Sequence, residues 1–402
     1  MLVGFMQRST KPSKIAKVTA LMCSHYGIDL IYLTPWDVNQ HDGMIKGKMY
    51  RQNKWISVKK ELPPIIDVSS KCFKKDTKEI MDYLRNNTTL TFDKKNTPNK
   101  EKLQDELSKD SNFAHLVIPT SPLDSFQRLE DFLAKYNSII MKPLFGNRGR
   151  GLHSLRKQGN QYILGYREEE KKLSHDQLLD YYNNFLTDEK YILQKLIESK
   201  TNEGYPFDCR VQVQKNGNGK WVVAKNFFRI GIGQKVMSNV HQGGGISDVE
   251  PFLKANFKNH WKEINQKLED LAETLPYKIE KIKGTPTMDL GFDIGIDRDG
   301  KLYLFESNNG ATKKPLIAES AMLRVEYYQY IRETYLEPEQ EMEKDTKMKS
   351  ATLDPQIKEL QDKNQALIQE RDVYRKKWSQ MQQSRSWRLT GPIRKISSLL
   401  KK

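Results

Sequence analysis

The chain of 402 residues has few of the features that assign a protein to a class at first reading. Its three cysteines are odd in number and far apart, which supports neither a disulfide framework nor a thiolate zinc site and fits a reducing cytoplasm. The seven histidines show no metal-binding spacing. No run of about eighteen apolar residues occurs, and the first residues lack the pattern of a secretory signal. We therefore expect a cytoplasmic protein without a membrane-spanning segment.

Acidic residues are scarce at the end of the chain, and this accounts for much of the net charge of +16. Residues 371–402 contain ten Lys or Arg and one Asp, a net charge of +9, which leaves +7 for the other 370 residues. The body is therefore mildly basic and the tail strongly basic. The 15 Phe, 18 Tyr and 6 Trp argue against disorder throughout, and the length favours two or three domains.

Patterning predicts three parts, 1–92, 93–338 and 339–402. The first opens as strand, helix and strand, with helical spacing of apolar residues over 13–26, and is expected to be a small α/β domain. Its first turn lacks the G-x-G-x-x-G of a dinucleotide site. The middle part is expected to be α+β, rich in antiparallel hairpins with Gly, Asn and Asp turns. Its expected helices span 122–136, 174–185 and 252–275.

A glycine-rich loop follows the strand-like segment SIIMKP in the middle part. Lys142 ends that strand, and Gly146, Arg148, Gly149 and Gly151 follow it. Glycine permits a close backbone approach, and backbone N–H groups beside cations can cradle a phosphate. The alternative is an ordinary glycine-rich hairpin turn.

Two carboxylates and an amide lie across a second hairpin, DLGFDIGIDRDGKLYLFESNN. Glu306 and Asn308 are two residues apart and share one face of a strand, while Asp293 lies on the neighbouring strand. Three oxygen ligands of this kind suit Mg²⁺, which completes its shell with water and triphosphate oxygens. The alternative is a pair of solvated acids, but the hairpin is apolar, and buried acids need a partner.

Together these motifs resemble the ATP-grasp superfamily over roughly residues 95–320. The segments FDCRVQVQKNGNGKWVV, FFRIGIGQKVMSN and HQGGG resemble its YheC/YheD-type branch, described as endospore coat-associated. The resemblance implies an ATP-grasp fold between the N-terminal α/β domain and a helical, coiled-coil tail. It also implies a ligase that uses ATP and Mg²⁺ to join a carboxylate to an amine through an acyl phosphate, on an anionic acceptor related to the cell envelope or a surface polymer. A non-catalytic coat or envelope scaffold with the same fold is the alternative.

The resemblance also implies roles for individual residues. Arg229 would face the transferred phosphate, because phosphoryl transfer needs cations around spreading negative charge. Each arginine has an alternative as a surface ion pair. Pro315 comes later than in the Glu-x-Asn-x-x-Pro turn of many such ligases, so Lys313 and Lys314 would bind an anionic acceptor or be solvated. For ATP, the resemblance implies Lys100, Lys142, Gly146, Arg148, Gly149, Gly151 and the hinge Gln194, Lys195, Leu196 and Ile197. Lys100 is expected on an early strand, and Lys102 is its alternative. For the metal it implies Asp293, Glu306 and Asn308, and for catalysis Arg210, Arg229 and Asn239, beside Asp208, Gly243 and Gly244.

The tail carries two further patterns. A heptad seam over 357–381, with Asn364 as its polar member, predicts a short parallel coiled coil and a homodimer, or else a single helix on the body. Residues 385–402 resemble the ending of many bacterial cell-surface glycosyltransferases. Their apolar stripe among basic residues predicts contact with the inner face of a membrane. Nucleic acid is the less favoured partner, since no aromatic stacking platform accompanies the charge.

Overall fold

The chain divides into two compact units, Met1–Leu336 and Glu337–Lys402. Of the second unit the computed structural model describes four residues, Ala366, Gln369, Val373 and Lys376, which are helical and exposed. The coiled coil predicted over 357–381 otherwise lies outside the described residues, as does 385–402 entirely. The boundaries predicted at 92/93 and 338/339 stay predictions. In the first unit the described residues are 1–95, 98, 100–144, 151–166, 169–187, 190–232, 244–310 and 316–336.

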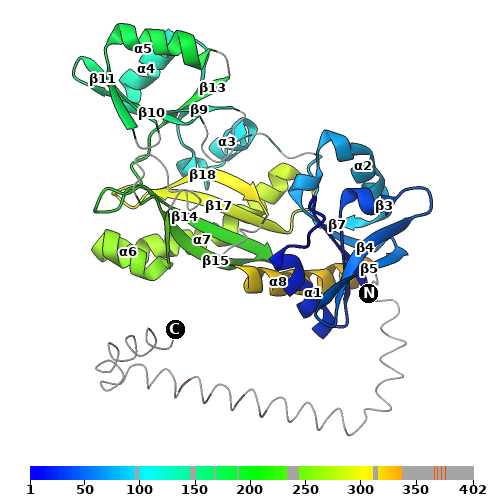
Figure 1. Ribbon diagram of the computed structural model, residues 1–402. Helices are drawn as coiled ribbons and strands as arrows, with labels where there is room; N and C mark the ends of the chain where they lie inside the picture. The colour runs from blue at the N-terminus through cyan, green and yellow to red at the C-terminus, as the bar shows by residue number, and fades with distance from the viewer. Residues whose placement is uncertain are drawn as a thin grey trace, which may run out of the picture. The chain divides into compact units, whose positions relative to one another are not determined.

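The first of three sheets mixes parallel and antiparallel strands (Figure 1). Its elements are β1 Leu2–Met6, α1 Lys14–His25, β2 Asp29–Leu33, β3 Val38–Asn39, β4 Met44–Arg51, β5 Lys54–Glu61, β6 Ile65–Val68, α2 Lys78–Asn87 and β7 Thr89–Leu90. The strand order is β3-β4-β2-β1-β6-β7, with β5 on the edge beside β4. Parallel pairing of β1 with β2 and β6 agrees with the expected α/β start. Ser13 fixes the beginning of α1, because its Oγ accepts from the Ala16 N–H at 3.4 Å.

The second sheet is antiparallel, in the order β12-β11-β10-β9-β13-β8. Its elements, after α3 Lys100–Ser108, are β8 Thr120–Leu123, α4 Phe126–Tyr136, β9 Ser138–Pro143, β10 His153–Gln158, β11 Gln161–Tyr166, β12 Glu169–Leu173, α5 His175–Tyr181 and β13 Tyr191–Lys195. The helix expected over 122–136 begins later, because Ser125 caps it by accepting from Arg128 N–H at 3.1 Å. A π-helical turn over Tyr182–Leu186 extends α5, as expected for 174–185.

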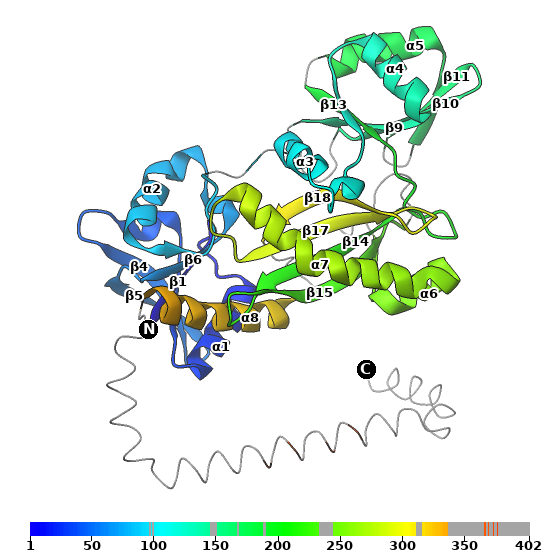
Figure 2. The ribbon, with the colours of Figure 1, turned by 180° about the vertical axis from the view of Figure 1, so that it is seen from behind.

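The third sheet is also antiparallel, in the order β16-β15-β14-β17-β18. Its elements are β14 Phe207–Lys215, β15 Trp221–Ile230, β16 Gly245–Ser247, α6 Val249–Phe257, α7 Trp261–Lys283, β17 Asp289–Ile296, β18 Leu302–Asn309 and α8 Ile317–Ile331. The single helix expected over 252–275 is two helices, separated at Lys258, whose φ is +41°. Figure 2 shows α6 and α7 across one face of this sheet, where Cys209, Val211 and Val213 join a buried apolar core. No described helix is long and apolar enough to cross a membrane.

Arg324 of α8 joins the first sheet to the third through buried ion pairs. Its Nη2 donates to Asp289 on β17 at 2.6 Å, and its Nη1 donates to Asp67 on β6. Tyr328 OH donates to the same Asp67 carboxylate. Burial alone would lower the pKa of Arg324, but the two carboxylates outweigh it and hold that pKa above its ordinary value. Apolar residues of α8 also pack beside α1 (Figures 1 and 2), so α8 belongs to both sheets.

Replacing Arg324 by Met should be strongly destabilising, because it leaves two carboxylates in the interior without their shared cation. We expect the free energy of unfolding, measured by urea denaturation, to fall by about 3–5 kcal/mol. Lys109→Met is the control, because Lys109 pairs with Asp105 on the exposed surface and its loss should not change the unfolding curve measurably. A loss from Arg324→Met no larger than in the control would contradict the linking role.

Candidate functional site

Four strands of the third sheet bring charged side chains onto the face opposite α6 and α7. The register places Asp208 of β14 opposite Arg229 of β15, and Arg210 of β14 opposite Asp293 of β17. Asp293 in turn lies opposite Glu306 of β18. Directly opposed residues share a face of a sheet, so these five side chains form one row.

Asp293 lies at the centre of the row and is 7% exposed. Arg210 Nε donates to its Oδ1 at 2.5 Å, and Arg229 Nη2 lies 3.0 Å from the same oxygen. Asn308 Nδ2 donates to Asp293 Oδ2 at 3.3 Å and to Glu306 Oε2 at 3.4 Å. One carboxylate oxygen of Asp293 thus contacts two guanidinium groups, while the other accepts from Asn308.

Arg229 is held in a fixed orientation by Asp208. Its Nε donates to Asp208 Oδ1 at 2.8 Å, and its Nη2 donates to Oδ2. Burial by itself would lower the pKa of Arg229, but Asp208 and Asp293 outweigh it and hold that pKa above its ordinary value. The side chain keeps 20% of its surface exposed. It is therefore a permanently charged donor with one edge available to a ligand.

The donor set around Asn308 fits Mg²⁺. Asp293, Glu306 and Asn308 all have oxygen-bearing side chains, and each of the two carboxylates lies within 3.4 Å of the Asn308 amide nitrogen. In the described residues no group of three His, Cys, Asp or Glu is placed to hold a metal, so an ion here would have two protein carboxylates and one amide. A small number of hard oxygen ligands is what Mg²⁺ uses when phosphates and water complete its shell.

Gly291 is a site residue that the sequence reasoning missed. It lies opposite Asn308, and a Cβ at this position would come within 2.8 Å of Gln212 Oε1 and 3.3 Å of Arg210 Nη1. Only glycine leaves room for these two side chains beside the row. The available signal was a glycine inside a strand, which marks a close approach.

The second sheet contributes Lys142, which is oriented by Gln194. Lys142 Nζ donates to Gln194 Oε1 at 2.8 Å, and Gln194 Nε2 donates to Thr120 Oγ1 at 3.1 Å. Gln194 is buried, so the chain of hydrogen bonds from β8 through β13 to β9 fixes the lysine. The sequence placed Gln194 only in the adenine hinge; the structure gives its side chain a second role.

The rest of the hinge continues from β13. The Lys195 N–H donates to Pro119 O and the Leu196 N–H to Ser138 O, each at 3.0 Å. For the Ile197 N–H, the described part of the chain offers no acceptor. Backbone donors in folded proteins are nearly always paired, so this N–H is suited to a ligand.

Other predicted site residues are placed less completely. Lys100 and Lys102 both lie on α3, so the expectation of an early strand was wrong; the Lys100 side chain lies outside the described residues, and Lys102 is exposed. Gly244 directly precedes β16. Gly151 has φ +72°, where a Cβ would lie 3.2 Å from Pro143 Cγ and Tyr191 OH. The predictions that fall outside the described residues are Gly146, Arg148, Gly149, Asn239, Gly243, Lys313, Lys314 and Pro315.

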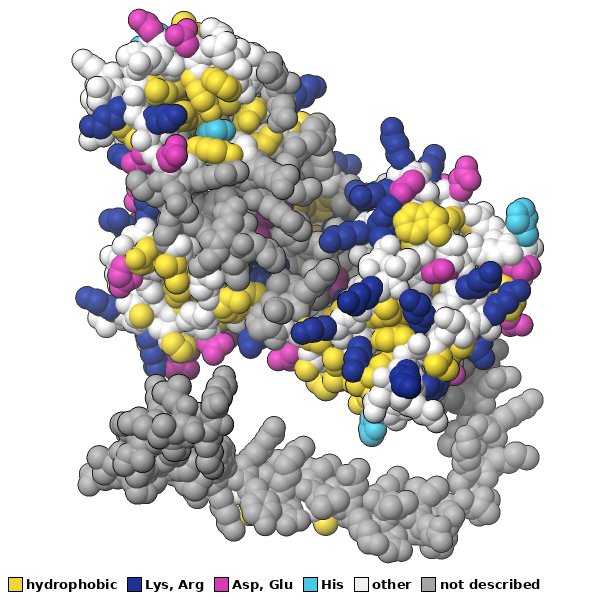
Figure 3. Space-filling view, viewed as in Figure 1, with side chains coloured by type: hydrophobic (Ala, Val, Ile, Leu, Met, Phe, Trp, Pro, Cys, Tyr) yellow, Lys and Arg dark blue, Asp and Glu magenta, His cyan; other side chains and the backbone are white. Residues whose placement is uncertain are grey.

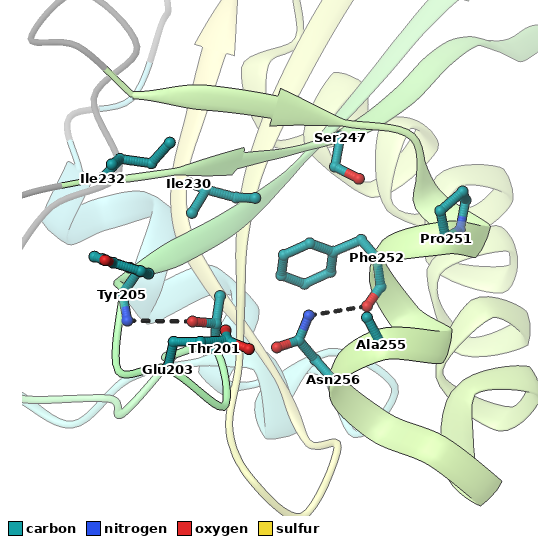
Figure 4. A pocket seen from close by; sticks show the side chains of 10 residues that line it. All are labelled: Thr201, Glu203, Tyr205, Ile230, Ile232, Ser247, Pro251, Phe252, Ala255 and Asn256. Atoms are coloured by element: carbon teal, nitrogen blue, oxygen red, sulfur yellow. Dashed lines mark hydrogen bonds between the residues drawn. The ribbon is translucent and has the colours of Figure 1, made fainter. Parts of the chain in front are cut away.

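An apolar pocket of about 370 Å³ lies on the other face of β15 (Figure 4). Ile230 lines it, and because neighbours along a strand point to opposite faces, Arg229 points away from it. Figure 4 shows Ile230 and Phe252 directed into the hollow. The pocket is therefore separate from the charged row. Its lining residues are Thr201, Glu203, Tyr205, Ile230, Ile232, Ser247, Pro251, Phe252, Ala255 and Asn256.

Comparison with known proteins gives one family and several relatives. The YheC/D-like ATP-grasp family matches residues 88–335. Endospore coat-associated protein YheC of Bacillus subtilis strain 168 is 22% identical over 340 residues, which cover 81% of this chain and 93% of the relative. YheD of the same strain is 23% identical over 289 residues, 68% of this chain and 62% of the relative. Among solved structures, the D-cycloserine synthetase DcsG has 13% identity and a TM-score of 0.48, covering 81% of this chain and 99% of that one.

Gly151→Ala should destabilise the protein more than Gly159→Ala. Both glycines have a positive φ, +72° and +59°, but a Cβ at position 159 has nothing within 4 Å. Each change costs about 1–2 kcal/mol of backbone strain, and Gly151→Ala adds roughly 1 kcal/mol or more from contact with Pro143 and Tyr191. Urea unfolding of the two variants measures the difference. Equal losses would mean that the base of the glycine-rich loop is not tightly packed.

Proposed function

Because the chain belongs to the YheC/D-like ATP-grasp family, we propose that it is an ATP- and Mg²⁺-dependent carboxylate–amine ligase. The family match confirms the resemblance read from the sequence, and the ATP-grasp fold follows from it. The observation that carries the proposal is the row of charges centred on Asp293, in which two arginines and two further oxygen-bearing side chains meet one carboxylate. Such a row suits phosphoryl transfer, which needs positioned positive charge more than a covalent group.

The reaction has two steps. A carboxylate oxygen of the acceptor attacks the γ-phosphorus of ATP, the bond from that phosphorus to the β–γ bridging oxygen breaks, and ADP and an acyl phosphate result. An amine nitrogen then attacks the acyl carbon, the C–O bond to phosphate breaks, and the amine loses a proton to water as inorganic phosphate leaves. When bound, Mg²⁺ would neutralise phosphate charge from its place beside Asp293, Glu306 and Asn308.

The residues of the chain divide the work by position. Arg229, which Asp208 keeps charged and oriented, would stabilise the negative charge that spreads over the phosphoryl oxygens. Lys142, which Gln194 orients, would bind a phosphate with the glycine-rich loop, and the Ile197 N–H would donate a hydrogen bond to the adenine edge. Arg210 would hold the Asp293 carboxylate in place.

We also propose the acceptor and the setting. The acceptor would be an anionic small molecule or polymer of the cell envelope, and the tail would form a homodimer over 357–381 and contact the inner membrane face over 385–402. The protein would then be cytoplasmic and peripheral to the membrane.

A non-catalytic scaffold is the second candidate, because the relatives YheC and YheD are named as coat-associated proteins.

Calorimetric titration with Mg-ATP tests the nucleotide site. We expect saturable binding by the unmutated chain and an affinity lower by about tenfold or more for Glu306→Gln, which removes one charge beside the metal. The matched control is Glu273→Gln on α7, an exposed acid on the helix that covers the opposite face, and it should bind normally. No saturable binding by the unmutated chain would end the proposal.

A screen of amino acids, peptides and uronate sugars for ADP release then separates a ligase from a scaffold, which releases none.

Arg229→Met should lower kcat far more than it weakens ATP binding, because the spreading charge that Arg229 meets exists only in the transition state. We expect a loss in kcat on the order of 10²-fold to 10³-fold. Asp208→Asn keeps the guanidinium but loosens it, so kcat should fall less, with ATP affinity unchanged. Steady-state kinetics with calorimetric affinities measure both. A large loss of ATP affinity at constant kcat would contradict the assignment.

A further inference from the structure

Six lysines lie together on one side of the first sheet, away from the charged row of the third. We call this surface the basic face: Lys11, Lys14 and Lys17 from α1 and the turn before it, Lys46 and Lys48 from β4, and Lys59 from β5. Figure 3 shows Lys and Arg side chains gathered over the part of the molecule that α1, β4 and β5 occupy.

The strand register and two contacts bring the hairpin lysines together with α1 and the turn before it. Lys46 lies directly opposite Lys59, and Lys48 shares their face because it is two residues from Lys46. Lys48 Nζ donates to Thr10 O at 2.9 Å, which brings the turn before α1 to the hairpin. From α1, Lys17 Nζ lies 5.0 Å from the centre of the Tyr50 ring, and Tyr50 is on the same face of β4.

The charge of this region is not balanced by neighbouring acids. Residues 1–92 contain fifteen Lys or Arg and eight Asp or Glu, a net +7, whereas the 244 residues of 93–336 carry +4. Two acids border the basic face at one end: Asp42, whose Oδ2 is 3.4 Å from Lys59 Nζ, and Glu61, opposite Met44. Like charges directly opposite each other, as at Lys46 and Lys59, destabilise a sheet. An anionic ligand would remove that repulsion.

The chemistry of the surface selects among anionic ligands. Ser57 on β5 lies opposite Lys48, and Thr10 in the turn before α1 contacts Lys48, so hydrophilic residues adjoin the hairpin lysines. Leu21 is a single exposed apolar side chain on α1. The described part of this face therefore has no continuous apolar stripe for insertion into a bilayer.

Tyr50 is buried beneath the lysines, and the partly buried Trp55 opposite it packs against Tyr32 and Tyr50. The described part of this face therefore presents no open ring on which bases could stack. Protein interfaces favour Tyr, Trp and Arg over Lys. A hydrated polymer with charges spaced along it needs only the point charges that lysines supply.

We propose that the basic face binds an anionic polysaccharide. The surface does not include the residues of the nucleotide site, so binding is expected without ATP and in the presence of EDTA. A ligase that acts on an envelope polymer would use such a surface to hold the polymer. The proposed binding does not depend on the ligase activity, so it stands even if that activity is disproved.

The test compares two double variants of the full chain on immobilised polygalacturonate, with neutral dextran as the blank. Lys46→Gln with Lys59→Gln removes two charges from the basic face; Lys54→Gln with Lys60→Gln removes two from the opposite face of the same hairpin. All four lysines are exposed, and the basic tail is the same in every protein. Biolayer interferometry at low salt should give an affinity about tenfold weaker for the first variant and nearly unchanged for the second. If the first double variant unfolds, the single changes Lys46→Gln and Lys59→Gln replace it.

Five outcomes overturn the proposal. The unmutated chain fails to bind polygalacturonate, or binds dextran equally well. Both double variants weaken binding to the same degree, which would mean attraction by net charge alone. The basic-face variant keeps polygalacturonate binding but loses binding to vesicles of phosphatidylglycerol and phosphatidylcholine, which would assign the face to a membrane. If the basic-face variant keeps polygalacturonate binding but loses binding to duplex DNA, the face would be assigned to nucleic acid.

Discussion

A buried carboxylate shared by two guanidinium groups is the constraint on which the third sheet depends. Asp293 meets Arg210 from β14 and Arg229 from β15 only if three strands pair in one register. A slip of one residue would turn the row of charges into the apolar core under α6 and α7. Removing one partner of such a pair leaves an uncompensated buried charge, which costs several kcal/mol. The charged face and the apolar face therefore specify the same strand pairing.

Parts of this arrangement could be predicted from the sequence because they are local. The hairpin of β17 and β18 follows from alternating apolar residues and from the turn at Gly300, whose φ is +74°. Period-two spacing alone puts Glu306 and Asn308 on one face. The contact between Arg210 and Asp293 spans 83 residues, and no periodicity specifies it. From the sequence, Arg210 was equally compatible with a surface ion pair.

Long-range and backbone effects explain what the sequence left out. The link from Arg324 to Asp67 joins positions 257 residues apart, and an amphipathic helix does not indicate which strand its charge will meet. The helix expected over 252–275 is interrupted because Lys258 takes a positive φ, although its apolar pattern continues. The sequence assigned Gln194 to the adenine hinge through its backbone, whereas its side chain orients Lys142. That contact depends on how β9 and β13 pair.

The position of α8 affects the order in which the protein is assembled during synthesis. Ile15 and Ala16 of α1 share one apolar cluster with Val325 and Tyr328 of α8, so nearly the whole first unit separates the two halves of that cluster in sequence. During synthesis β1 and α1 are made well before α8, which is complete only when the ribosome has passed residue 331. Contacts between such distant segments form slowly, and until then apolar surface stays exposed to chaperones and to other chains. The first sheet is thus made long before the helix that completes its apolar cluster.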